Sequence, residues 1–165
     1  MDGLYIATSA GVGAFERTNG HWQEVNWRTL DPEVTSVSVG GGHVFAGTVD
    51  GVFRSDDRGN TWEPMSEGLT LRHIRWLDQH PEEPTRILAG TEPAGIFLSS
   101  DEGRHWTGHP HIEELRDSYG WYLPYSPEAG CVRGFALHGK RAYGAVEQGG
   151  LLRSDDRGDR SEEHT

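Results

Sequence analysis

The chain has 165 residues, which is enough for one domain with a substantial core. It contains 23 glycines and six tryptophans but only 34% hydrophobic residues, a composition typical of many short strands joined by tight turns. The formal charge of −11 opposes binding to nucleic acid and to anionic lipid, so we expect no nucleic-acid partner and no membrane partner.

The chain shows no targeting signal and no membrane-spanning stretch. Its first residues lack a basic region and an apolar run, and no segment approaches the roughly 18 apolar residues that a membrane span needs. We therefore expect a soluble, cytoplasmic protein without a cofactor. Cys131 is the single cysteine, which excludes an internal disulfide, and we expect it to be a buried structural thiol.

Short predicted strands follow one another in groups of four, which we denote A to D from the inside of the fold outward. The first group lacks its A strand, and we expect a later part of the protein to supply it. Its predicted strands B to D are residues 4–8, 12–15 and 20–22. The second group comprises residues 34–39, 43–48, 51–55 and 61–65.

The third and fourth groups repeat this order. The third comprises residues 73–77, 86–91, 95–99 and 105–107. The fourth comprises residues 132–137, 140–146 and 150–154, and its D strand is missing. A long connection, residues 107–131, separates the two groups and carries no strand pattern.

A sequence motif marks the turn between strands C and D. The pattern S-x-D-x-G-x-T-W occurs in full once and in part twice, and its serines are 44 and 55 residues apart. This spacing is close to the ~40–45 residues of a four-stranded propeller blade. The motif residues are Ser55, Asp57, Gly59, Thr61 and Trp62 in the first copy, Ser99, Asp101, Gly103 and Trp106 in the second, and Ser154, Asp156 and Gly158 in the third.

With these motifs the chain resembles the Asp-box (BNR) repeat β-propellers, which include sialidases, sortilin-type receptors and photosystem II assembly-factor-like proteins. The resemblance implies an all-β fold: an incomplete β-propeller, with about three to four four-stranded antiparallel blades of a larger ring. It also implies that the Asp-box residues hold the fold and lie away from the ligand. A calcium loop is the alternative for residues 56–59, but the distal bidentate glutamate of an EF-hand is missing.

Candidate ligand-binding residues lie on the opposite side, in the turns between strands B and C. The B–C turn of three groups carries an acidic residue: Asp50, Glu92 and Glu147. These carboxylates are either acid/base groups or ligands of sugar hydroxyls, or they are ordinary solvated turn residues. Trp121 and Tyr122 lie in the aromatic segment 119–125, whose rings suit stacking on a ligand, or fold over their own blade. The pattern His109-x-His111-x-Glu113 is a weak metal motif, because Pro110 interrupts a strand there, and we expect no metal site.

These residues favour a non-catalytic scaffold that binds carbohydrate or protein. We also expect the chain to pack against the rest of its own propeller. The alternative is a glycoside hydrolase of sialidase-like or xyloglucanase-like type, with catalytic residues partly in a C-terminal half that the chain lacks. The Arg-Ile-Pro element that the sialidase resemblance requires does not occur. Residues 1–159 form the predicted propeller segment. Residues 160–165 resemble the translation of a sequencing-adapter oligonucleotide, so we expect a non-native tail.

Overall fold

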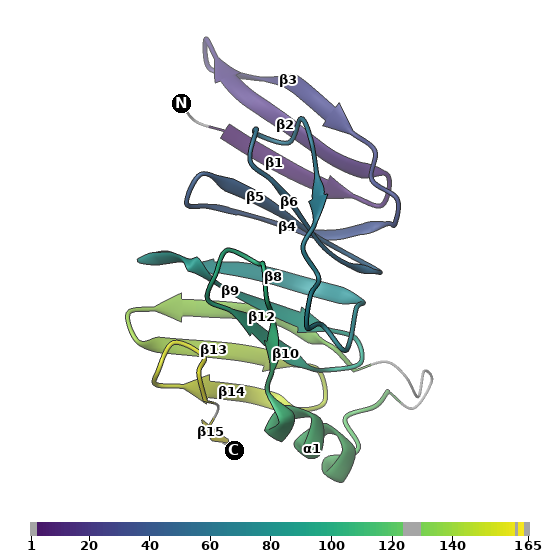
Figure 1. Cartoon of the computed structure of the whole chain (residues 1–165), viewed down its shortest axis with the longest axis vertical. Coiled ribbons are helices and arrows are strands. Elements are labelled where there is room, and N and C mark those ends of the chain that lie inside the picture. The colour runs from purple at the N-terminus through teal and green to yellow at the C-terminus, as the bar shows by residue number, and fades with distance from the viewer. Residues whose placement is uncertain (1–2, 124–129, 161, 164–165) are drawn as a thin grey trace.

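The structure, a computed structural model, describes residues 3–123, 130–160 and 162–163. Four antiparallel sheets stack face to face along the long axis of the molecule (Figure 1). The first sheet has three strands in the order β1 (Gly3–Thr8), β2 (Gly11–Thr18) and β3 (His21–Arg28). They correspond to strands B, C and D, and the described residues supply no A strand beside β1, in line with the sequence pattern.

The second and third sheets each have four strands. The second contains β4 (Val34–Gly40), β5 (His43–Thr48), β6 (Gly51–Ser55) and β7 (Glu63–Pro64). The third contains β8 (Ile74–His80), β9 (Glu83–Thr91), β10 (Ile96–Ser99) and β11 (Thr107–Gly108). Consecutive strands pair in an antiparallel way, so each sheet is a meander, and the first strands of the two sheets, β4 and β8, contact each other.

The fourth sheet corrects one prediction. It contains β12 (Val132–His138), β13 (Arg141–Val146), β14 (Gly150–Ser154) and also β15 (Glu162–Glu163). The expectation that this sheet lacks a D strand is therefore wrong, because β15 pairs with β14 in antiparallel register. Ladder hydrogen bonds join backbone groups, so a segment without the strand pattern can still occupy this place.

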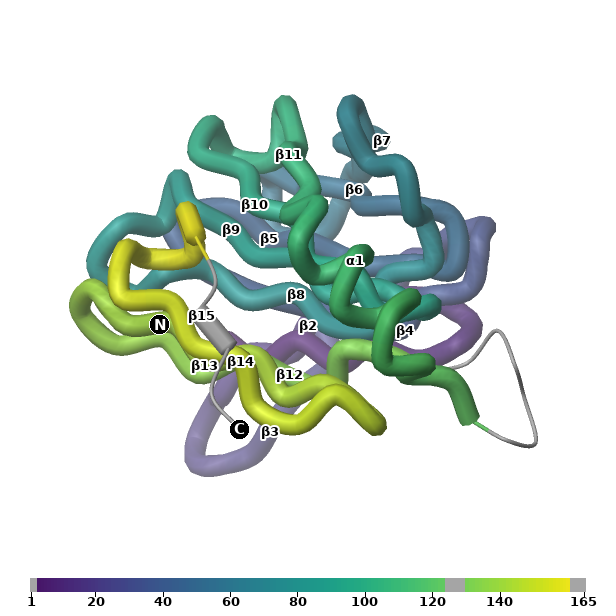
Figure 2. Tube along the Cα trace, turned by 90° about the horizontal axis from the view of Figure 1, so that it is seen from below, coloured from purple at the N-terminus to yellow at the C-terminus, as the bar shows by residue number. Residues whose placement is uncertain are grey.

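The long connection between the third and fourth sheets contains a helix that the sequence analysis missed. Helix α1 (Pro110–Tyr119) begins with a proline in its first turn and is capped by Gly120, which has a left-handed conformation with φ 64°. Its buried residues are Ile112, Leu115 and Arg116, which lie on one helix face. Figure 2 looks at the stack from the end where α1 and the fourth sheet lie.

The hydrophobic core lies between the sheets rather than within one layer. Each of three buried clusters fills one junction between successive sheets. Phe45 and Ile74 are fully buried between the second and third sheets, and Ile112 of α1 joins the cluster between the third and fourth. Burial of this apolar area stabilises the stack, because each sheet alone would expose both faces.

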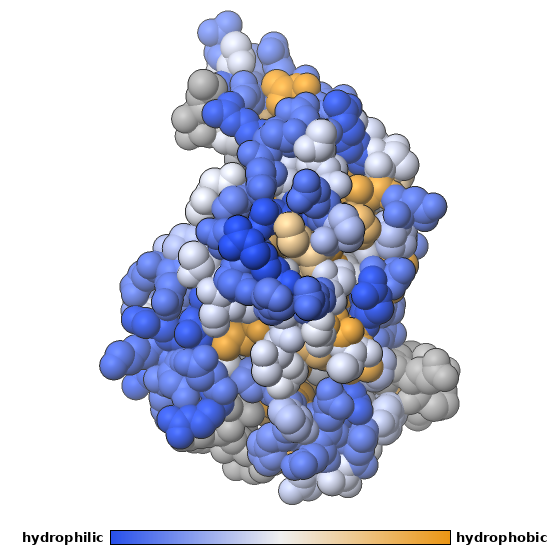
Figure 3. All heavy atoms as spheres, in the orientation of Figure 1, coloured by the Kyte–Doolittle hydropathy of each residue, from blue (hydrophilic) through white to orange (hydrophobic). Residues whose placement is uncertain are grey.

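The two ends of the stack expose apolar side chains. Leu4 and Ile6 of the first sheet are 38% and 40% exposed, and Leu151 of the fourth is 51% exposed. The face drawn in Figure 3 is otherwise mainly hydrophilic, with small separate apolar patches. The stack thus has the layout of consecutive blades whose outer faces have no neighbouring sheet among the described residues.

Candidate functional site

The Asp-box turn of the second sheet is held by hydrogen bonds from its own motif residues. The Ser55 hydroxyl donates to Asp57 Oδ1 at 2.9 Å and accepts from the Gly59 N–H at 2.7 Å. Asp57 accepts from the Thr61 N–H at 2.8 Å and from the Thr61 hydroxyl at 2.7 Å. These bonds to the ionised form, led by those from Thr61, lower the pKa of Asp57.

The other two copies of the motif repeat this arrangement. In the third sheet His105 replaces the threonine, and its Nδ1 lies 2.6 Å from Asp101 Oδ2. Burial raises the pKa of Asp101, but hydrogen bonds from His105 and Ser99 outweigh it and lower the pKa to about 2. In the fourth sheet Asp156 accepts from the Arg160 N–H at 2.8 Å. The carboxylates of the motif are thus engaged within their own turns.

Each Asp-box glycine lies against strand B of the preceding sheet. A Cβ added to Gly59 would lie 3.7 Å from Tyr5, one on Gly103 would lie 2.8 Å from Phe45, and one on Gly158 would lie 3.1 Å from Leu88. All three glycines have positive φ. The preceding sheet also donates to the carbonyls of these turns, as Asn26 does to Gly59 at 2.7 Å. These contacts favour a role of the boxes in joining successive sheets.

The three carboxylates of the B–C turns lie on the other side of the stack, and each pairs with an arginine. Arg72 pairs with Asp50, Arg75 with Glu92 at 3.5 Å, and Arg133 with Glu147 at 2.6 Å. Arg72 lies two residues before β8, and Arg75 and Arg133 are the second residues of β8 and β12. Sequence reasoning missed all three, although the matching positions of Arg75 and Arg133 in strand A were a visible signal.

We call these six residues the turn surface: Asp50, Arg72, Arg75, Glu92, Arg133 and Glu147. The Arg133 guanidinium holds the pKa of Glu147 below its usual range. Beside this pair, the Cys131 thiol is 2% exposed and donates to Glu147 Oε2 at 3.6 Å. Burial raises the pKa of this thiol, which disfavours the reactive thiolate form of Cys131.

The aromatic segment does not present its first ring to a ligand. Trp121 is 5% exposed and belongs to the core cluster between the third and fourth sheets. It packs against the B–C turn of the fourth sheet, where a Cβ on Gly149 would lie 2.8 Å from the indole. The Tyr122 hydroxyl donates to Asp117 of α1 at 2.7 Å. Of the two alternatives for this segment, the buried Trp121 fits a loop that folds over its blade, and residues 124–129 of the segment lie outside the described residues.

No protein-family model matches the chain, and no curated protein is significantly similar to it in sequence. Solved structures are similar in fold. The GH74 xyloglucanase from Xanthomonas campestris has 19% identity and a TM-score of 0.66 over 96% of this chain and 28% of its own. YCF48 from Cyanidioschyzon merolae has 15% identity and a TM-score of 0.62 over 97% of this chain and 51% of its own.

The chain is an incomplete β-propeller. Its four sheets are blades, and the chain spans between 18% and 28% of the length of the first matched GH74 enzymes. Numbered along the chain, blade 1 contains β1–β3, blade 2 β4–β7, blade 3 β8–β11 and blade 4 β12–β15. The turn surface and the Asp boxes lie on opposite sides of these blades, because strand direction alternates within each blade.

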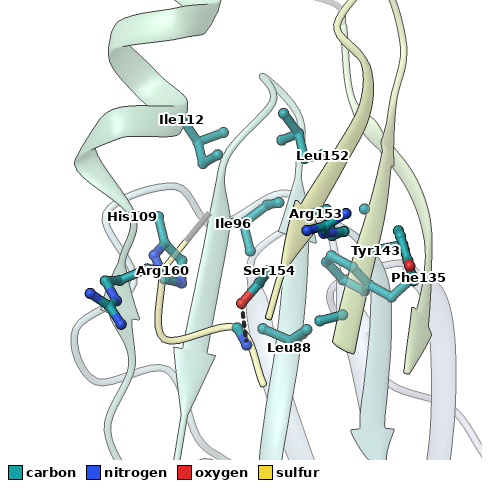
Figure 4. Close-up of a pocket in the computed structure, with 13 residues that line it drawn as sticks. Leu88, Ile96, His109, Ile112, Phe135, Tyr143, Leu152, Arg153, Ser154 and Arg160 are labelled. Carbon is teal, nitrogen blue, oxygen red and sulfur yellow. Dashed lines mark hydrogen bonds between the residues drawn. The ribbon is translucent and has the colours of Figure 1, made fainter. Parts of the chain in front are cut away.

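A small apolar cavity lies between blades 3 and 4 (Figure 4). Its walls include Leu88, Ile96, Ile112 and Leu152, and its volume is about 30 Å³. That space corresponds to about one water molecule, so the cavity is a packing gap and no ligand pocket.

The residues weighed as metal ligands do not converge. His111 lies on the exposed side of α1 with its Nδ1 3.7 Å from Glu114. Within the described ranges no group of three histidine, cysteine, aspartate or glutamate side chains is arranged to hold a metal ion. Over the same residues, the helices are too short and too polar to cross a bilayer.

Proposed function

We propose that the chain is a binding scaffold that holds a protein segment on the turn surface. The observation that carries the proposal is the row of three arginine–carboxylate pairs on consecutive blades. Such a row offers donors and acceptors at repeated positions along one side of a rigid fold, which suits the polar groups of an extended partner segment.

The exposure of these pairs supports their use in binding. Arg133 is 54% exposed at its side chain, and Arg72 is 47% exposed. Exposed ion pairs contribute only about 0–1 kcal/mol to folding. A partner can therefore replace one member of a pair with its own charged or polar group at little cost to the fold.

Similar structures include propellers with protein partners. One is YCF48 bound to a D1 peptide, which has 14% identity and a TM-score of 0.50. Another comes from a nidogen/laminin complex, with 12% identity and a TM-score of 0.52. These likenesses support a propeller that binds a protein, and the choice of the turn surface depends on the ion pairs of this chain.

Glycoside hydrolysis is the second candidate, and Asp78 of β8 is the observation that favours it. Burial raises the pKa of this carboxyl group, which is the direction that a general acid requires. In contrast, the hydrogen bond from Arg133 lowers the pKa of the turn-surface carboxylate Glu147, which is the opposite direction. Hydrolysis of xyloglucan oligosaccharides by the chain, abolished by Asp78→Asn, would favour this candidate over the scaffold.

The scaffold proposal is tested with an array of 15-residue peptides of varied charge, probed with the labelled 165-residue chain. We expect a subset of peptides to bind, with affinity that falls as salt is raised. Arg133→Ala should weaken their binding about tenfold. Arg141→Ala is the matched control, because Arg141 is 64% exposed and pairs with Asp155 at the opposite end of blade 4. An array without bound peptides, or equal binding by Arg133→Ala and the unsubstituted chain, would refute the proposal.

A further inference from the structure

A groove lies between blades 1 and 2 on the Asp-box side of the propeller. Its volume is about 650 Å³, within the size range of small-molecule sites. Strands β1, β2 and β3 line it from blade 1, and the β4–β5 turn and the Asp-box turn line it from blade 2. The groove is remote from the turn surface, because the two lie on opposite sides of the blades.

The groove exists because one side chain of blade 1 is short. Tyr5 of strand B pairs across the ladder with Ala14 of strand C. The same register pairs Phe45 with Arg54 in blade 2 and Leu88 with Leu98 in blade 3. Arg54 and Leu98 are 8% and 9% exposed, so long side chains occupy this place at the next two junctions. Ala14 is 5% exposed and lies at the floor of the groove, where its methyl group does not fill the place that these longer side chains take.

The junction between blades 2 and 3 shows how completely a long side chain closes this space. The Arg54 guanidinium crosses to blade 3, where it donates to the Glu102 carbonyl at 3.2 Å. It also donates to Asp56 at 3.0 Å. At the first junction, Asn26 and Arg28 of β3 make the corresponding bridge further out, to the Gly59 and Asn60 carbonyls at 2.7 and 2.9 Å. The blades are thus joined at the rim while the groove inside stays open.

The walls of the groove combine aromatic and neutral polar groups. Tyr5 contributes an aromatic ring, and Asn26 and Asn60 contribute amides. Each amide nitrogen donates within the protein at 2.7 Å, which fixes the side chain and leaves its oxygen as an acceptor.

The charges of the groove balance. Glu16 and Arg58 face each other across the junction at 3.8 Å, with side-chain exposures of 37% and 73%. A negative and a positive group at this distance offer a donor and an acceptor to a ligand without favouring an anion or a cation. An aromatic ring beside such groups matches a molecule with an apolar C–H face and many hydroxyl groups.

We infer that the groove between blades 1 and 2 binds a neutral oligosaccharide. A sugar C–H face packs on Tyr5, and hydroxyl groups bond to Asn26, Asn60 and the Glu16–Arg58 pair. This site is independent of the proposed protein-binding function. Substitutions on the turn surface therefore leave saccharide binding unchanged, and substitutions in the groove leave peptide binding unchanged.

The test titrates the 165-residue chain with cellohexaose and xylohexaose as neutral probes and with trigalacturonate as an anionic probe, followed by calorimetry and amide NMR shifts. A neutral probe should bind and shift the amides around Tyr5 and Asn60. Ala14→Arg, which introduces the residue that fills the next junction, should weaken binding at least tenfold. Ala145→Arg is the matched control, because Ala145 is exposed on blade 4.

A stability check and a second variant keep the result clear. Each variant is first checked for an unchanged thermal midpoint. Should Ala14→Arg fail this check, Glu16→Ala replaces it, because Glu16 has only a loose ion pair at the surface and its loss should weaken binding by several-fold. Binding that survives in the folded variant, binding of trigalacturonate alone, or no binding by either neutral probe would each overturn the inference.

Discussion

Gly103 allows a direct test of the Asp box as a joint between blades. Its φ is +82°, and an added Cβ would lie 2.8 Å from Cε1 of Phe45. Phe45 is fully buried, so its ring has little room to move away. Gly103→Ala therefore combines backbone strain of about 1–2 kcal/mol with overpacking of about 1–3 kcal/mol.

Gly20→Ala separates these two contributions. Gly20 has nearly the same φ, +83°, and no atom within 4 Å of the added Cβ. Gly20→Ala therefore introduces the backbone strain without the overpacking. The free energy of unfolding of Gly103→Ala should be lower than that of Gly20→Ala by about 1–3 kcal/mol. For a chain of this size, that difference corresponds to thermal midpoints roughly 2–12 °C apart.

The assay is thermal and urea unfolding followed by circular dichroism on the two variants and the unsubstituted chain. A third variant carries Phe45→Leu together with Gly103→Ala. It should lose less stability than the sum of the single changes, because the smaller side chain relieves the contact. Equal midpoints for Gly103→Ala and Gly20→Ala, or strict additivity in the double variant, would show that the box glycine does not act through the preceding blade.

Two other predictions concern the same motif. Trp106 is 4% exposed and donates from Nε1 to the Met65 carbonyl at 2.8 Å, so Trp106→Ala should destabilise the chain by about 3–5 kcal/mol in urea unfolding. Trp22 is 46% exposed, so an equal loss of stability in Trp22→Ala would contradict the explanation by burial. Asp101 has a folded pKa of about 2 against an ordinary 3.8, so its stabilising effect is present above about pH 4 and lost as pH falls toward 2. Acid titration of the unfolding midpoint should therefore be flatter in Asp101→Asn, and an identical acid profile would argue against the Asp101 hydrogen bonds.

The strands could be predicted from the sequence because their signals are local. Predicted strand 43–48 coincides with β5, and predicted strand 51–55 coincides with β6. Alternating apolar residues, glycines at turns and the repeated motif are signals that each span only a few residues. Every blade can therefore be recognised from its own segment of the sequence. The three-stranded first sheet follows from the same register.

The signals for the candidate sites were less complete. The positions of Asp50, Glu92 and Glu147 in the B–C turns were predictable from the repeat. Their arginine partners were not assigned, because an ion pair depends on the distance between strands and not on a motif. Helix α1 was missed because its apolar residues, Ile112 and Leu115, form only one short stripe.

The sequence by itself determined the repeated blade, because four strands and one turn motif recur within each group and need no distant contact. Only the tertiary structure decided what lies between the blades. Trp121 is buried because α1 and the fourth blade enclose it, although its segment reads as an aromatic loop. The groove beside Ala14 opens because the place that Arg54 fills in the next blade holds a methyl group. Packing between blades depends on pairs of side chains far apart in the chain, and a local pattern carries no information on which pairs will meet.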